Sequence, residues 1–141
     1  MRPRFRITSN RPALDARLQQ AINRKVTAIG LEVHHTLLNE VLVGTRSGRT
    51  YRVPGTQRTY QASQPGEAPA TRLGDLRRSY KVGRVQAAGW NTTIQVGSTI
   101  AYAPALEFGT SSMPARPHLA PATNLALPRI LAELATRDWG I

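Results

Sequence analysis

The strongest pattern in the chain is an apolar stripe that runs through residues 11–42. Apolar side chains recur there at steps of three or four, which places them on one face of an α-helix. The stripe consists of Leu14, Leu18, Ile22, Val26, Ile29, Val33, Leu37 and Val41. Asn10 suits the N-cap of this helix, Pro12 its first turn, and Gly44 its end.

This expected helix is long for the size of the chain. It would span roughly 48 Å, whereas a compact chain of 141 residues has a diameter of only about 35–40 Å. The helix must therefore bend, for instance at Gly30, or project beyond its own domain. A projecting helix needs a neighbour to cover its stripe, which is a first indication of an oligomer.

The middle of the chain predicts a hairpin and a long loop. Residues 41–53 suit a hairpin that turns at Ser47-Gly48, where glycine adopts positive φ readily. Residues 54–72 are rich in Pro, Gly, Ser and Thr and nearly lack aliphatic side chains. We therefore expect residues 44–72 to form a hairpin and loop that are mobile in an isolated subunit.

Shorter elements follow this loop. A short helix is expected over LGDLRRSY, residues 73–80, with Thr71 as its cap. Residues 80–100 alternate apolar and polar side chains, as strands do, and a turn at residues 89–91 would join them. Residues 101–108 have helical spacing and end at Gly109, which we expect at positive φ.

The C-terminal part predicts a second long helix. Pro114 and Pro117 would stiffen an extended link that leads to it. Residues 124–139 carry leucines and isoleucine on one face, and Pro128 must either start or kink this helix. The expected fold is one α+β domain over residues 1–141, with a long N-terminal helix and a C-terminal helix packed on a small antiparallel β-sheet.

The charge of the chain indicates an acidic partner. The formal net charge is +11, and arginine greatly outnumbers lysine. A GC-rich genome would also favour arginine. However, the basic residues cluster between residues 44 and 84, which favours a contact surface for nucleic acid or for the acidic face of another protein. The cluster comprises Arg46, Arg49, Arg52, Arg58, Arg72, Arg77, Arg78, Lys81 and Arg84.

The sequence offers little for catalysis or cofactor binding. The absence of cysteine excludes thiol nucleophiles, thiolate metal sites and disulfides. His34 and His35 are adjacent, so a helix separates their side chains by about 100° and they do not share a metal easily. No phosphate-binding loop, dinucleotide motif or hydrolase motif is present. We expect no enzyme, no cofactor and no metal. The basic N-terminus lacks a following apolar run, so no secretory signal is expected. No stretch approaches the roughly 20 apolar residues that span a bilayer, so no membrane partner is expected.

One carboxylate, Glu107, stands out because it lies among apolar neighbours just before Gly109. It could be a catalytic acid, a structural acceptor or part of an assembly surface. Catalysis needs a partner group that the sequence does not provide. We therefore favour a structural carboxylate that accepts hydrogen bonds from the Gly-Thr-Ser-Ser turn, or that pairs with Arg116.

The segment YAPALEFGTSSMPARPHLAPA, residues 102–122, resembles a pattern of the small neck and tail-completion proteins of long-tailed, lambda-like bacteriophages. Three upstream segments also resemble that family, in the same order: SGRTYRV, YQASQPGEAPAT and LGDLRRSY. The chain departs from the family pattern at Leu73, Ser112, His118 and Ala120. The matching positions are Tyr102, Ala103, Glu107, Phe108, Gly109, Thr110, Met113, Pro114, Ala115, Arg116, Pro117, Leu119, Pro121 and Ala122.

The resemblance implies a structural virion protein that is made in the host cytoplasm and sits at the head–tail junction. Family members form a ring around the DNA channel, here expected to be a hexamer, between the head-closure proteins and the tail. The residues expected in the structural turn and its assembly surface are Tyr102, Glu107, Phe108, Gly109, Thr110, Met113, Pro114, Arg116 and Pro117. A tail terminator at the same junction and a free nucleic-acid-binding domain are the alternatives.

The basic loop is expected to contact a partner through Arg46, Arg49, Arg52 and Arg58. An adjacent subunit or an acidic neighbour suits these arginines, because guanidinium groups pair with carboxylates in a bidentate manner. DNA is the competing partner, but a conduit through which DNA slides gains little from many tight phosphate contacts.

Overall fold

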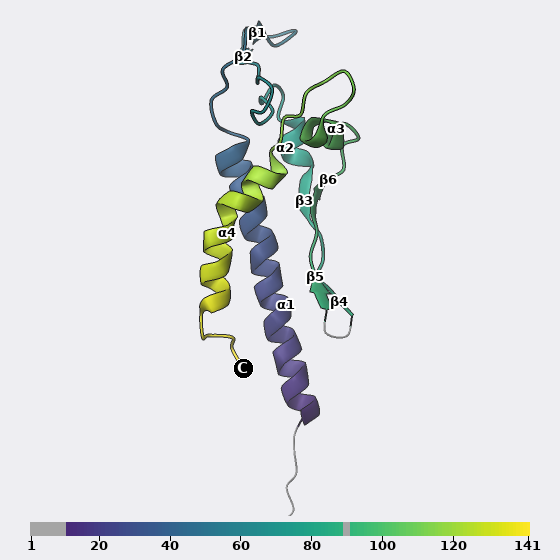
Figure 1. Ribbon diagram of the computed structural model, residues 1–141, viewed down its shortest axis with the longest axis vertical. Helices are drawn as coiled ribbons and strands as arrows, with labels where there is room; N and C mark the ends of the chain where they lie inside the picture. The colour runs from purple at the N-terminus through teal and green to yellow at the C-terminus, as the bar shows by residue number, and fades with distance from the viewer. Residues whose placement is uncertain (1–10, 89–90) are drawn as a thin grey trace, which may run out of the picture.

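The computed structural model describes residues 11–88 and 91–141, and its longest element is the N-terminal helix. Helix α1 spans Arg11–Thr36 and continues as one π-helical segment, η1, over Leu37–Val41. The expected helix is therefore confirmed over almost its whole length, while its expected cap Asn10 lies outside the described residues. The N-terminal end of α1 extends beyond the other elements (Figure 1). Of the two alternatives from the sequence, the projecting helix is confirmed.

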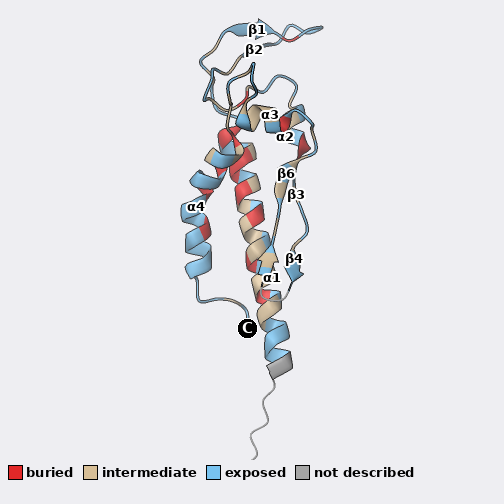
Figure 2. Ribbon diagram, turned by 45° about the vertical axis from the view of Figure 1, so that its right-hand side comes forward, coloured by how far each residue is buried: buried red, intermediate tan, exposed pale blue. Residues whose placement is uncertain are grey.

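Helix α4, Leu119–Ala135, runs antiparallel to α1 along one side of it (Figure 1). Val33 of α1 packs with Ala126 and Ile130 of α4 in one buried cluster. A second cluster lies nearer the C-terminal end of α1 and contains Leu37, Val41, Leu42, Tyr80 and Ala122. The buried residues gather at this end of α1, whereas its N-terminal end is exposed (Figure 2). The core is thus small and lies towards one end of the molecule.

A long antiparallel ribbon covers the other side of α1 (Figure 1). Strand β3, Tyr80–Val82, pairs with β6, Val96–Ser98, and β4, Gln86–Ala88, pairs with β5, Asn91–Thr93. Gly30 of α1 lies against this ribbon, because a Cβ atom there would stand only 2.7 Å from Ile94 and 3.1 Å from Val82. Gly30 therefore permits a close approach of helix and ribbon.

The third two-stranded sheet corrects the expected hairpin turn. Strand β1, Thr50–Arg52, pairs with β2, Thr59–Gln61, and the chain reverses between them, where Gly55 has a φ of 74°. Gly48 lies outside the turn, and its amide donates to the Ala62 carbonyl at 2.9 Å. The prediction of a turn at Ser47-Gly48 was wrong because Pro54-Gly55 also forms a turn, and only that position lets β1 pair with β2.

Two further boundaries differ from the sequence prediction. Helix α2 spans Asp75–Ser79 and follows Gly74, which has a φ of 80° and takes the place expected for a Thr71 cap. The Thr71 hydroxyl instead donates to the Leu42 carbonyl just beyond η1. Helix α4 begins at Leu119, so Pro128 lies inside the helix and does not start it.

The described residues confirm the α+β class, with a long N-terminal helix, a C-terminal helix and small antiparallel sheets. The strands form three separate two-stranded sheets and no single continuous one. The short helix α3, Ala103–Phe108, completes the fold beside α2. Within the described ranges, no helix has the length and apolar character that crossing a membrane requires.

Candidate assembly site

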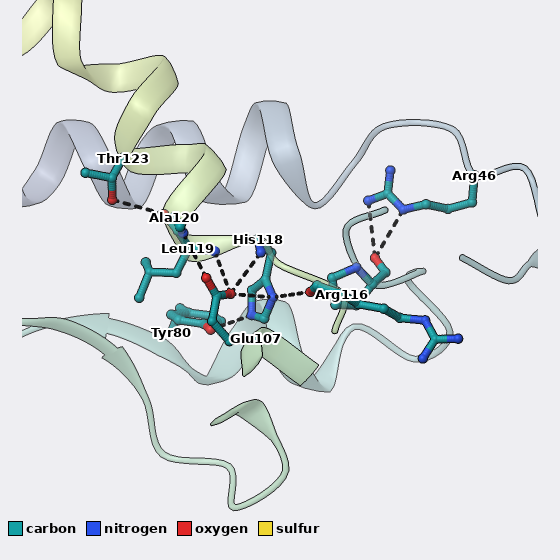
Figure 3. A network of polar contacts seen from close by, with 9 residues as sticks. Arg46, Tyr80, Glu107, Arg116, His118, Leu119, Ala120 and Thr123 are labelled. Atoms are coloured by element: carbon teal, nitrogen blue, oxygen red, sulfur yellow. Dashed lines mark hydrogen bonds and ion pairs between the residues drawn. The ribbon is translucent and has the colours of Figure 1, made fainter. Parts of the chain in front are cut away.

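Glu107 caps the N-terminus of α4 from the neighbouring helix α3 (Figure 3). Its Oε2 atom accepts hydrogen bonds from the amides of His118 and Leu119 at 2.8 and 3.0 Å, and its Oε1 atom accepts from Ala120 at 3.0 Å. The first amides of a helix have no acceptor within the helix, and they carry partial positive charge that favours an anion. The structural reading of Glu107 is confirmed.

The donors differ from those expected. The Gly-Thr-Ser-Ser turn is closed without Glu107, because the Thr110 amide donates to the Met113 carbonyl at 2.8 Å and the Met113 amide donates to the Thr110 hydroxyl at 3.1 Å. The guanidinium of Arg116 points elsewhere and donates to the Ser63 carbonyl at 3.4 Å. Both specific partners proposed from the sequence are therefore wrong. Sequence proximity favoured the turn, whereas the chain returns to Glu107 eleven residues later.

His118 extends the cap into the core. Its side chain is fully buried, with Nδ1 3.0 Å from Glu107 Oε2 and 3.0 Å from the Arg116 carbonyl. Two acceptors face Nδ1, so a neutral imidazole carries its proton there. Its Nε2 then accepts from the Tyr80 hydroxyl at 2.6 Å. The network joins α3, the start of α4 and β3 (Figure 3).

The acidity of this network reflects its burial and its hydrogen bonds. Burial raises the pKa of Glu107, but hydrogen bonds from the amides of His118, Leu119 and Ala120, with a smaller electrostatic contribution from the His118 side chain, together lower it by more, so it lies below its ordinary value of 4.5. Burial, with a smaller contribution from the Glu107 charge, raises the pKa of Tyr80 to about 12. Glu107 is thus ionised and Tyr80 protonated at neutral pH.

The order carboxylate, imidazole, hydroxyl is also found in some catalytic sites, but here all three side chains are enclosed. His118 is fully buried, Tyr80 is 6% exposed and the Glu107 side chain is 10% exposed. A substrate atom would need contact with the hydroxyl or the imidazole. This arrangement holds three elements together and leaves little of the three side chains exposed.

Gly109 ends α3 at positive φ, as expected. Its φ is 76°, and its amide donates to the Ala105 carbonyl at 2.9 Å. A Cβ atom at this position would stand 2.8 Å from the Ala115 amide nitrogen and 2.9 Å from the Met113 carbonyl oxygen. Glycine is therefore required both by the backbone conformation and by the return of the chain over it.

The remaining predicted residues around this turn have different environments. Tyr102 and Phe108 are exposed, and Phe108 is 80% exposed. Pro114 and Pro117 lie in the non-helical link before α4, in agreement with the expected extended link. The amide of Arg116 donates to the Leu106 carbonyl at 2.7 Å, which holds the link against α3.

The basic loop is joined to this site through its backbone. The Gly66 amide donates to the Ala115 carbonyl at 3.0 Å. Glu67 accepts hydrogen bonds from the hydroxyl and amide of Ser47 and from the amide of Gln64. Residues 44–72 thus contain strand pairing and several long-range bonds.

Of the four arginines expected to bind a partner, Arg46 is engaged within its own chain. Its guanidinium donates to the carbonyls of Val41, Gly44, Thr45 and Pro69 at 2.7–3.3 Å. It closes the end of η1 and is therefore a structural residue. Arg49, Arg52 and Arg58 are exposed on and beside the β1–β2 hairpin, so the prediction of a partner contact now concerns these three.

The sequence analysis missed two sets of interacting side chains. His118 was assigned no role from the sequence, yet it is the centre of the buried network. Arg129 of α4 binds Glu32 at 2.9 Å and Glu40 at 2.6 Å, which fastens α4 to α1 and η1. A helical projection of 119–135 would have indicated only that Arg129 borders the buried face. Among the described residues, no cluster of histidine and acidic side chains has the geometry of a metal site.

Comparisons with protein-family models, curated proteins and solved structures find no match to this chain.

Replacing Glu107 tests the cap. We expect Glu107→Ala to lower the free energy of unfolding by about 1–3 kcal/mol, because three helix amides lose their acceptor. Glu107→Gln should cost less, since its amide oxygen still accepts. Chemical denaturation at neutral pH measures both. Equal stability of the two variants and the wild type would contradict the assignment.

The same cap predicts a dependence on pH. The pKa of Glu107 is lowered by folding, so its contribution is fully present above the unfolded value near 4.5 and is lost as pH falls through the folded value. Glu40 and Glu67 also have lowered pKa values, so total stability does not isolate Glu107. The difference in unfolding free energy between wild type and Glu107→Gln should shrink below pH 4.5. A difference that stays constant down to the acid transition would count against the cap.

Gly109→Val should destabilise the fold by more than a typical surface change. It places a β-branched residue at positive φ, and its Cβ collides with backbone atoms of Met113 and Ala115. Gly55→Val is the matched control, because Gly55 also has positive φ but has no atom within 4 Å of its Cβ position. Thermal melts should show the larger loss at Gly109. Similar losses at both positions would mean that conformation alone matters.

Proposed function

We propose that this chain is a structural subunit of the bacteriophage head–tail junction, a neck or tail-completion protein that assembles as a ring around the DNA channel. The proposal rests first on the resemblance of residues 45–122 to that family. It assigns no catalytic role to any residue, and it names head-closure proteins and tail proteins as neighbours.

The observation that carries the proposal is that the resembling segments interlock in space. SGRTYRV and YQASQPGEAPAT are joined through Ser47 and Glu67. YQASQPGEAPAT is joined to the last segment by the Gly66 amide and the Ala115 carbonyl, and LGDLRRSY is joined to it by Tyr80 and His118. Four segments that are separate along the chain thus form one connected structure. This contact supports the interpretation that their resemblance to one family reflects one shared fold.

The large accessible surface supports an assembled state. The chain exposes 10447 Å². A compact monomer of 15.5 kDa would expose only about 7,200 Å². The twelve residues outside the described ranges account for at most about 2,200 Å² of this area, at the surface per dalton of an unfolded chain. Such a small core with so much surface suits a subunit that is completed by its neighbours.

The basic hairpin favours a neighbour of different composition over a second copy. Of the eight acidic residues, seven are engaged within the chain: Glu32 and Glu40 with Arg129, Glu67 with Ser47, Asp75 with Arg78, Glu107 with α4, Glu133 with Lys25, and Asp138 with the Gly140 amide. A second copy therefore offers few free carboxylates to Arg49, Arg52 and Arg58. An acidic head or tail protein is the better partner for them.

DNA is the second candidate partner, and the exposed Tyr51 beside these arginines favours it. Tyr51 pairs with Tyr60 across the hairpin, with ring centres 6.0 Å apart. Aromatic and basic side chains together are typical of nucleic-acid surfaces.

Mass spectrometry of purified particles tests the structural role. We expect the chain to be present in virions with complete tails. Its number of copies per virion should correspond to one ring, well below that of the tail-tube protein. A phage that carries Gly109→Val should accumulate separate heads and tails, because the destabilised subunit assembles poorly. Complete tailed virions that lack the chain would end the proposal.

Salt dependence distinguishes the two partners of the hairpin. Each phosphate contact contributes about −0.9 to the slope of log affinity against log salt, so six or more would cost roughly a thousandfold between 50 and 200 mM. We expect weak duplex binding by the purified subunit, unchanged when Arg49, Arg52 and Arg58 are all replaced by Ala. Tight binding with a steep slope that the triple variant flattens would favour DNA.

A further inference from the structure

Phe108 is a large apolar side chain that its own chain leaves uncovered, and we call it the anchor. It is 80% exposed and ends α3, between the largely enclosed Glu107 and the constrained Gly109. Glu107 is bound to the start of α4, and the Gly109 amide donates to the Ala105 carbonyl within α3, so the backbone that carries the ring is held in place. Aromatic side chains supply large apolar area with little rotamer entropy, and they dominate protein interfaces. A phenylalanine held in this way and left in water is suited to insertion into a partner.

The same chain carries an unfilled pocket. A half-open hollow of about 440 Å³ lies between α2, α3 and the segment 60–73. Its lining includes Leu42, Leu76 and Leu106, together with Tyr60, Tyr102 and Arg72. It is large enough to admit a phenyl ring. Arg72 is exposed and has no ion pair among the described residues, so it is available to lie over an aromatic face.

The anchor and the pocket lie on different faces of α3. Tyr102 and Leu106 line the pocket and are four positions apart, so they share one face. Phe108 follows Leu106 by two positions, which rotates it by about 200° around the helix axis. One copy can therefore use the pocket towards one neighbour and the anchor towards the other. Contacts between two different surfaces of the same chain propagate head to tail, and they close into a ring when the rotation from one copy to the next divides a full turn.

We propose that Phe108 of one copy inserts into the pocket of the next copy, between α2 and α3, and that this contact forms the subunit interface. The inference deepens the proposed ring and depends on it for the closed assembly. Charge also favours this pairing. The chain carries +11 overall and the pocket lining contains three arginines against one aspartate, yet residues 108–115 contain no charged side chain. The anchor therefore approaches the pocket without the repulsion that other surfaces of a second copy would meet.

Two variants test the contact in purified protein. Phe108→Arg removes the anchor and adds charge, while Ala70→Phe fills the pocket, which Ala70 lines. Leu31→Arg is the control, because Leu31 is an exposed leucine on α1 away from both surfaces. Light scattering after size exclusion should show rings for wild type and Leu31→Arg, and monomers for each of the two interface variants alone. Thermal melts confirm that all are folded.

Mixing the two interface variants gives the sharper result. One retains a pocket and the other an anchor, so the mixture should form dimers and nothing larger. Rings formed by either variant alone, a mixture that stays monomeric, or a monomeric wild type would overturn the inference. None of these results bears on whether the chain is present in virions. The proposed function is therefore tested separately, by mass spectrometry of the particles.

A photo-crosslinking phenylalanine analogue at position 108 locates the contact directly. We expect crosslinked dimers whose peptides map to the segment 60–76 of the second copy. The same analogue at position 31 should give no such product. Crosslinks from position 108 to another segment, or to position 108 itself, would contradict the head-to-tail contact.

Discussion

The structure depends on one carboxylate at the start of one helix. Glu107 accepts the first free amides of α4, which begins at Leu119. The early start brings Ala122 and Ala126 into the turns that pack on α1 and η1. Both alanines are fully buried, so the helices approach closely there. Without the cap, the amides in the first turn of α4 would lose their acceptor. The two core clusters would then lose the helix that contributes residues to both of them.

The cap also fixes surfaces that lie outside it. His118 connects Glu107 to Tyr80, which holds the ribbon of β3 and β6 to the same point. Gly109 turns the chain back over α3 and leaves Phe108 directed outward. A small buried network thereby positions an exposed anchor. This explains how a chain with a limited core can still present a defined interface.

The sequence predicted the elements whose signal is local. Eight apolar positions at helical spacing were enough for α1, and a glycine after a short apolar helix was enough for Gly109 at positive φ. The acceptor role of Glu107 was also predicted, because a lone carboxylate among apolar neighbours must be satisfied.

The partners of these residues could not be predicted, because they are set by tertiary contacts. The amides that Glu107 binds lie eleven to thirteen residues away, after a turn whose path depends on Gly109. Two turn sequences, Ser47-Gly48 and Pro54-Gly55, were both possible, and strand pairing selected the second. His118 lies between two prolines, in a sequence typical of exposed links, and its burial follows only from the packing of α3, α4 and β3.

The most direct measurement is the titration of three amide protons by nuclear magnetic resonance. The amides of His118, Leu119 and Ala120 donate to one carboxylate, so their chemical shifts should move together with a single midpoint below 4.5. In Glu107→Gln, which cannot titrate, these three movements should disappear. Amide shifts that do not change with pH, that have separate midpoints, or that persist in the variant would contradict the cap on which this account of the structure rests.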